Sequence, residues 1–144
     1  MRKDVETVWL HKGDNLFGGG NLNLLIHTGK AEGEYIPQGI LEEVLIHEAT
    51  HTSLDCMGCS ALGFDHRNTK GWQNAVKTDN KFISRYAKDF PYREDMAETF
   101  LVWMVVRYRS KEYDSHAKRI LATIPNRIKY FDEQNFNMFP IEIR

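Results

Sequence analysis

The sequence predicts a mixed α+β fold with a small N-terminal lobe that contains strands, a central helix and a helical C-terminal lobe. Three observations support this prediction. The first third is rich in glycine and holds two short strand-like runs. A longer apolar run follows it. In the rest of the chain, apolar residues recur at the spacing of a helix. Because no repeat or low-complexity segment interrupts the chain, we expect the two lobes to form one domain over residues 1–144.

Two short strands are predicted in the N-terminal third. Residues 5–11 (VETVWLH) alternate between apolar and polar side chains well enough to form a short strand. Residues 22–28 (LNLLIHT) give the clearest strand pattern. The glycine-rich residues 11–21 between them predict a turn. His27 lies within the second strand, and we expect it to be a sheet histidine rather than a metal ligand.

A helix is predicted over residues 38–54, just after Pro37. It is apolar on nearly every side except at Glu42 and Glu43, so we expect it to be buried. A buried helix must provide partners for its polar side chains, because an unpaired buried polar group costs about 1–3 kcal/mol.

This helix carries the pattern H-E-x-x-H as His47, Glu48 and His51. At 3.6 residues per turn, the two histidines share one face and both can reach one metal ion. Glu48 then lies beside the metal, where a carboxylate can deprotonate a water. Asp55 is on the same face, four residues after His51, and fits equally well as an acceptor for the second ring nitrogen of His51 or as a plain helix-end residue.

The C-terminal two thirds predict a series of helices. Short helices are expected over residues 71–79 and 82–88, and a long one over residues 92–109 with Asp89 as its N-cap. Two further helices are expected, at residues 115–123 and from Pro125 onward.

The long helix offers Glu94 and Glu98, one turn apart, as candidates for a third ligand. Two imidazoles and one carboxylate leave the fourth zinc position to water, which is the arrangement of a hydrolytic zinc site. A longer form of the motif has a glycine and a third histidine downstream, but Leu54 and Met57 occupy those positions and exclude it.

The segments HEATHTSLD and YAKDFPYREDMAETF together resemble the H-E-x-x-H plus E-D-x-A-E-x-F arrangement of gluzincin-type zinc metallopeptidases. In particular, they resemble the group that includes the lethal factor catalytic domain and the proline-proline endopeptidases. The resemblance covers roughly residues 20–105 and implies a zincin-like fold. It also implies a Zn²⁺ ion, a peptide substrate that pairs along the strand at residues 22–28, and the following site residues: His47, His51 and Glu94 as ligands, Glu48 as general base, and Glu98 as a supporting acid.

In that group a tyrosine upstream of the ligand glutamate stabilises the oxyanion. The resemblance implies Tyr86 for this role, although it precedes Glu94 by eight residues where the group's usual spacing is seven, and Tyr92 is its rival. Such catalytic domains also carry more sequence before the central helix than the 36 or so residues present here. A minimal or truncated N-terminal lobe is therefore expected.

The predicted function is zinc-dependent hydrolysis of peptide bonds in a peptide or protein. The alternatives are an inactive zinc-binding or structural domain derived from a peptidase, and a metal hydrolase that acts on other bonds. The lone pair Cys56 and Cys59 lacks the second pair of a thiolate zinc site, so a loop disulfide or free thiols are expected.

A net charge of −1 provides no basic surface, so neither nucleic acid nor an anionic membrane is an expected partner. No apolar run approaches the roughly 20 residues that span a bilayer, and the chain as given begins without an export signal. Compartment and oligomeric state are left open by the sequence.

Overall fold

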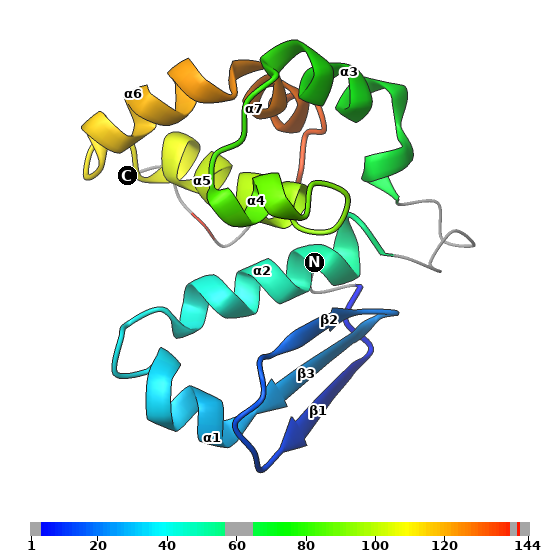
Figure 1. The fold of residues 1–144 in the computed structure, drawn as a ribbon, viewed down its shortest axis with the longest axis vertical. Helices are drawn as coiled ribbons and strands as arrows, with labels where there is room; N and C mark the ends of the chain where they lie inside the picture. The colour runs from blue at the N-terminus through cyan, green and yellow to red at the C-terminus, as the bar shows by residue number, and fades with distance from the viewer. Residues whose placement is uncertain (1–3, 57–64, 139–140, 142–144) are drawn as a thin grey trace. The chain divides into compact units, whose positions relative to one another are not determined.

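A computed structural model describes residues 4–56, 65–138 and 141 (Figure 1). It is a mixed α+β structure with one small sheet and several helices, which confirms the predicted class. The chain divides into two compact units, unit 1 over residues 1–66 and unit 2 over residues 67–144. In the described part of the chain, no helix has the length and apolar character to cross a membrane.

Unit 1 contains a three-stranded sheet and the helix that carries the histidines. Its elements are β1 (Thr7–His11), β2 (Gly18–Gly20), β3 (Asn23–His27), α1 (Thr28–Lys30), the π-helical turn η1 (Ala31–Tyr35) and α2 (Leu41–Ser53). The strand order is β1-β3-β2, with β3 parallel to β1 and antiparallel to β2. Both predicted strands are confirmed. The resemblance implies that a substrate pairs along residues 22–28, which needs an open edge there, but β3 has β1 on one side and β2 on the other.

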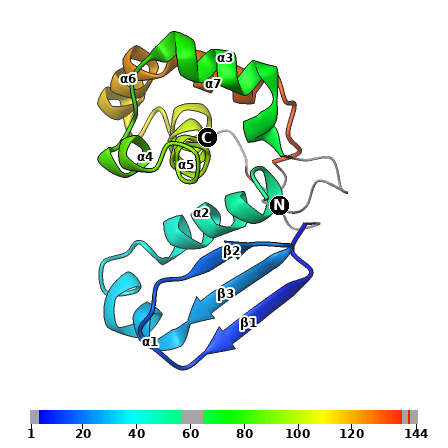
Figure 2. The same cartoon turned by 45° about the vertical axis from the view of Figure 1, so that its right-hand side comes forward.

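The strand β2 lies where the sequence predicted only a turn. Strand patterns are recognised from side chains, and Gly18–Gly20 has none. The lack of a side chain is required at Gly19, where a Cβ atom would lie 1.8 Å from the backbone oxygen of Glu48. Figures 1 and 2 accordingly show β2 beside α2, with β1 as the strand farthest from that helix.

Thr52 fixes α2 to the sheet. Its hydroxyl accepts a hydrogen bond from the Gly20 N–H (3.0 Å) and donates to the Asn23 carbonyl (2.9 Å). Because Thr52 is buried, both bonds are shielded from water. The position of the histidine-bearing helix over β2 and β3 is therefore set by a threonine in its last turn.

The core of unit 1 fills the space between the sheet and the N-terminal part of α2. Phe17 and Tyr35 meet edge to face, with ring centroids 5.0 Å apart, and half-buried side chains of α2 pack on them. The helix begins at Leu41 rather than residue 38, because the preceding residues form turns. The expectation of a buried helix holds only near its C-terminal end, where Thr50, Thr52 and Ser53 are buried; its apolar side chains are half-buried.

Unit 2 is helical, as predicted. Its helices are α3 (Lys70–Asp79), α4 (Arg85–Asp89), α5 (Asp95–Tyr108), α6 (Asp114–Thr123) and α7 (Pro125–Asp132). An aromatic cluster forms its core, with Phe100 and Trp103 of α5 against Phe131 of α7. Met96 and Trp72 are buried as well.

The start of α5 differs from the prediction. Asp89 is not the N-cap of the long helix but the last residue of α4. The Phe90 carbonyl accepts hydrogen bonds from the N–H groups of Arg93 and Glu94, which closes a separate turn before α5 begins at Asp95. Glu94 is therefore the N-cap residue of α5 rather than a residue inside a continuous helix.

A buried ion network holds this end of α5. Arg127 of α7 donates from Nε to Asp95 (2.9 Å) and from Nη1 to Asp79 of α3 (3.2 Å), and all three side chains are buried. Burial raises the pKa of Asp95 to about 6, although the Arg127 charge acts in the opposite direction. The first turn of α5, next to Glu94, is thus tied to two other helices of unit 2.

Candidate metal centre

His47 and His51 come together on one face of α2, as the helical spacing predicted. Their Nε2 atoms lie 3.1 Å apart, and the rings meet edge to face with centroids 4.8 Å apart. Two nitrogen ligands of a tetrahedral zinc ion, each about 2.0–2.1 Å from the metal, are about 3.3 Å apart. The observed separation therefore fits two ligands that converge on one ion.

Asp55 orients the His51 ring. Its carboxylate oxygens lie 3.0 and 3.2 Å from Nδ1 of His51, and Asp55 is only 3 % exposed. A carboxylate at Nδ1 favours the tautomer in which Nδ1 carries the proton, which leaves the Nε2 lone pair available to a metal. Of the two interpretations of Asp55, the structure shows the acceptor for the second ring nitrogen.

Glu48 lies on the same helix, directly after His47. Its backbone oxygen lies where Gly19 of β2 packs closely against α2. The hydroxyl of Thr52, one turn later, contacts the same oxygen. The position of the Glu48 backbone therefore depends on the absence of a side chain at Gly19 of β2. No pattern in the sequence indicates this dependence or the role of Thr52.

Glu94 and Glu98 lie in unit 2, one turn apart, since the Glu98 N–H donates to the Glu94 carbonyl (2.9 Å). Glu94 is buried, and Arg93 Nη2 lies 3.3 Å from its carboxylate. Glu94 is the N-cap residue of α5, so its charge lies at the N-terminus of this helix, where the helix dipole favours negative charge.

The two tyrosine candidates are both exposed. Tyr86 lies on α4, with its ring 5.4 Å from that of Phe90. Tyr92 lies in the turn before α5, and the Arg67 guanidinium stacks on its ring at 4.7 Å while Arg67 Nη1 donates to its carbonyl at 3.3 Å. Tyr92 therefore has a structural contact that holds its ring.

Among the described residues, His27 and Cys56 lie outside this group of side chains. His27 lies at the end of β3 with its ring 5.6 Å from that of His11, which agrees with the expected sheet histidine. Cys56 is disulfide-bonded, in agreement with a loop disulfide, whereas Cys59 and most of the loop after it are outside the described residues.

Comparisons of this chain with protein families, curated proteins and solved structures found no match.

Proposed function

We propose that this protein is a zinc-dependent peptidase with a zincin-like fold. The observation that carries the proposal is the pair of convergent imidazoles in unit 1, with Nε2 atoms 3.1 Å apart and Asp55 on the far side of one ring. This geometry supports a metal site, and the adjacent Glu48 is the proposed base.

The proposed ligands are His47, His51 and Glu94, each offering one donor atom to a metal. When bound, zinc lowers the pKa of a coordinated water toward about 7. Glu48 accepts the proton of the attacking water and passes it to the leaving amine. With three protein ligands, one position is left for water, which a purely structural site would fill with protein.

Tyr86 is the proposed donor to the oxyanion of the tetrahedral intermediate. The stacking of Arg67 on Tyr92 supports this choice, because it gives Tyr92 a separate role. Glu98, one turn after Glu94, is proposed as a supporting acid rather than as a ligand.

A peptide substrate would add as a strand to an open edge of the sheet. Since β3 is central, the edge beside α2 is β2. We therefore propose β2, in place of β3, as the strand with which a substrate pairs.

The test compares zinc content and cleavage of a mixed peptide library for the wild type, Glu48→Gln and Glu43→Gln. Glu43 is an exposed residue of the same helix and serves as the matched control. We expect all three proteins to hold one zinc ion and only Glu48→Gln to lose cleavage, by roughly 10²–10⁴-fold. A wild type that holds zinc and cleaves nothing would instead support the inactive zinc-binding domain, and unchanged zinc content in His47→Ala would refute the metal site.

A further inference from the structure

In the part of the chain that the structure describes, the outer edge of β1 is unpaired and apolar. β1 pairs with β3 on one side, and among the described residues no strand pairs with its other side. All five of its residues are exposed, with Trp9 at 57 % and Leu10 at 69 %. Edge strands usually carry a charge, a proline or a bulge that prevents pairing with another chain. The sequence of β1, TVWLH, contains no acidic residue, no lysine and no proline.

The hydrogen-bonding direction of this edge follows from contacts at both ends of β1. The Leu22 carbonyl accepts from the N–H groups of Glu6 (2.8 Å) and Thr7 (3.3 Å), and the His11 carbonyl accepts from the hydroxyl of Thr28, the residue after β3 (3.4 Å). With the register of β1 and β3, these contacts direct the backbone groups of Thr7, Trp9 and His11 toward β3. Val8 and Leu10 alternate with them and direct their N–H and C=O groups outward. The free edge therefore presents two residues with the spacing of an antiparallel hydrogen-bonded ladder.

We propose that this edge pairs with the same edge of a second copy of the chain, antiparallel and centred on Trp9. In this register Val8 faces the partner's Leu10, and Leu10 faces the partner's Val8, as hydrogen-bonded pairs. Trp9 faces the partner's Trp9 at a position without hydrogen bonds, where cross-strand side chains lie closest. A two-fold axis makes the contact self-complementary and closes it at a dimer.

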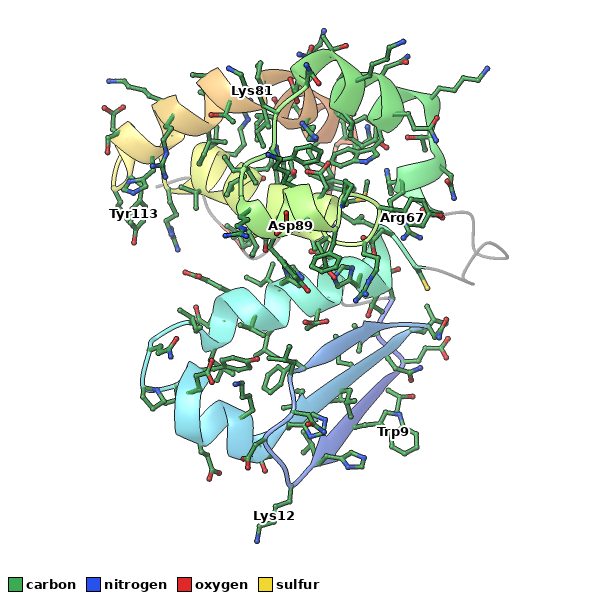
Figure 3. All side chains as sticks on the ribbon, viewed as in Figure 1. Trp9, Lys12, Arg67, Lys81, Asp89 and Tyr113 are labelled. Carbon is green, nitrogen blue, oxygen red and sulfur yellow. The ribbon has the colours of Figure 1, made fainter. Side chains whose placement is uncertain are left out.

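Charge complementarity selects both the occupant and the register. Centred on Trp9, the exposed Glu6 at one end of β1 faces the partner's Lys12, and Lys12 faces the partner's Glu6. A register centred on Val8 would place Glu6 against the partner's Leu10, and one centred on Leu10 would place Lys12 against the partner's Val8. Figure 3 shows Trp9 and Lys12 projecting outward from β1.

The oligomeric state of the whole chain tests this proposal, and the metal centre does not enter it. Sedimentation velocity at low salt, over about 1–300 µM, should show a dimer that dissociates on dilution, as expected for a small interface. Leu10→Lys places a charge on the edge and should abolish the dimer. Leu16→Lys removes an equally exposed leucine outside β1 and should leave it unchanged. Circular dichroism of both variants checks that they fold.

A charge swap tests the register. Glu6→Lys or Lys12→Glu alone creates two like-charge pairs and should weaken the dimer roughly tenfold, whereas the double variant should restore it. In the wild-type dimer, the amide hydrogens of Val8 and Leu10 should become protected from exchange. A wild type that stays monomeric throughout the range overturns the proposal, as does a dimer that Leu10→Lys does not weaken. A dimer without rescue by the double variant refutes this register.

Discussion

At the scale of single residues, the candidate metal centre depends on side chains that hold ligands in place. The Asp55 carboxylate is hydrogen-bonded to Nδ1 of His51, which restricts rotation of the ring. The Nε2 atom of His51 therefore stays on the side of His47. A preorganised ligand loses less conformational freedom when a metal binds. The metal affinity should therefore depend on Asp55, although this side chain does not itself bind the ion.

Asp55→Asn tests this dependence. An amide is a weaker acceptor than a carboxylate, and it can present its NH₂ group to Nδ1 and so favour the wrong tautomer. We expect zinc affinity to fall by about 10–100-fold, measured by competition with a chromogenic chelator. Asp89→Asn, at the exposed end of α4, is the control and should bind zinc as the wild type does. Equal affinities of all three proteins would remove Asp55 from the site.

Gly19→Ala tests the close approach of β2 to α2. The new methyl group would overlap the Glu48 backbone oxygen, so strand and helix must separate. We expect a loss of about 1–3 kcal/mol in the free energy of unfolding, measured with urea. Gly33→Ala, at a position with no atom within 4 Å of the new Cβ, should be neutral or slightly stabilising. A Gly19→Ala variant as stable as wild type would contradict the contact.

At the scale of elements, unit 2 is held by polar links between helices as well as by its aromatic core. Asp132 of α7 accepts hydrogen bonds from Trp103 Nε1 (2.9 Å) and Arg107 Nε (2.6 Å), both on α5. Burial alone would raise the pKa of Asp132, but the bonds from Arg107 and Trp103 outweigh it and hold that pKa below its usual value. The ionised carboxylate is therefore bound more favourably in the folded state than in the unfolded chain.

The lowered pKa fixes the sign of a pH dependence. A depressed carboxyl pKa stabilises the fold above the unfolded pKa of about 3.9, and the contribution is lost as pH falls through the lower folded value. We expect Asp132→Asn to destabilise the protein by about 1 kcal/mol at pH 7, and by much less at pH values where the wild-type carboxyl is protonated. Urea unfolding of wild type and variant, at pH 7 and at a pH where the carboxyl is protonated, measures this difference in the free energy of unfolding. Asp114→Asn, in an exposed pair with Lys118, is the control, and a destabilisation by Asp132→Asn that is independent of pH would refute the explanation.

At the scale of the whole molecule, the proposed zinc ion links metal binding to stability, because its proposed ligands His47, His51 and Glu94 come from distant parts of the sequence. A ligand that binds only the folded protein raises its stability by RT ln(1 + [L]/Kd), about 4 kcal/mol at a thousandfold excess over Kd. Zinc should therefore stabilise the folded protein, and its removal by a chelator should lower the unfolding temperature.

Calorimetry of Glu94→Gln and Glu98→Gln, with zinc and with chelator, tests this ligand assignment. Glu98 lies one turn further along and is the matched control. We expect Glu94→Gln to lose most of the zinc-dependent rise in unfolding temperature and Glu98→Gln to keep it. The reverse result would make Glu98 the third ligand, and an equal rise in both variants would exclude a ligand from either position.

The sequence by itself predicted the mixed class, most of the helices and the convergence of His47 and His51. These features are local, because helical periodicity relates residues a few positions apart and decides which share a face. The position of Asp55 beside His51 follows from the same periodicity. Its role as acceptor, one of two predicted alternatives, needed the observed contact.

Only the tertiary structure decided which strand is central, where β2 lies and how α2 is fixed. Gly18–Gly20 has no side-chain pattern, so its pairing with β3 and its contact with Glu48 depend on backbone packing between segments far apart in the sequence. The start of α5 at Asp95 likewise depends on a turn closed by Phe90 and on Arg127, 32 residues beyond Asp95. Local periodicity carries no information on such contacts, because their energies arise only when the chain has folded.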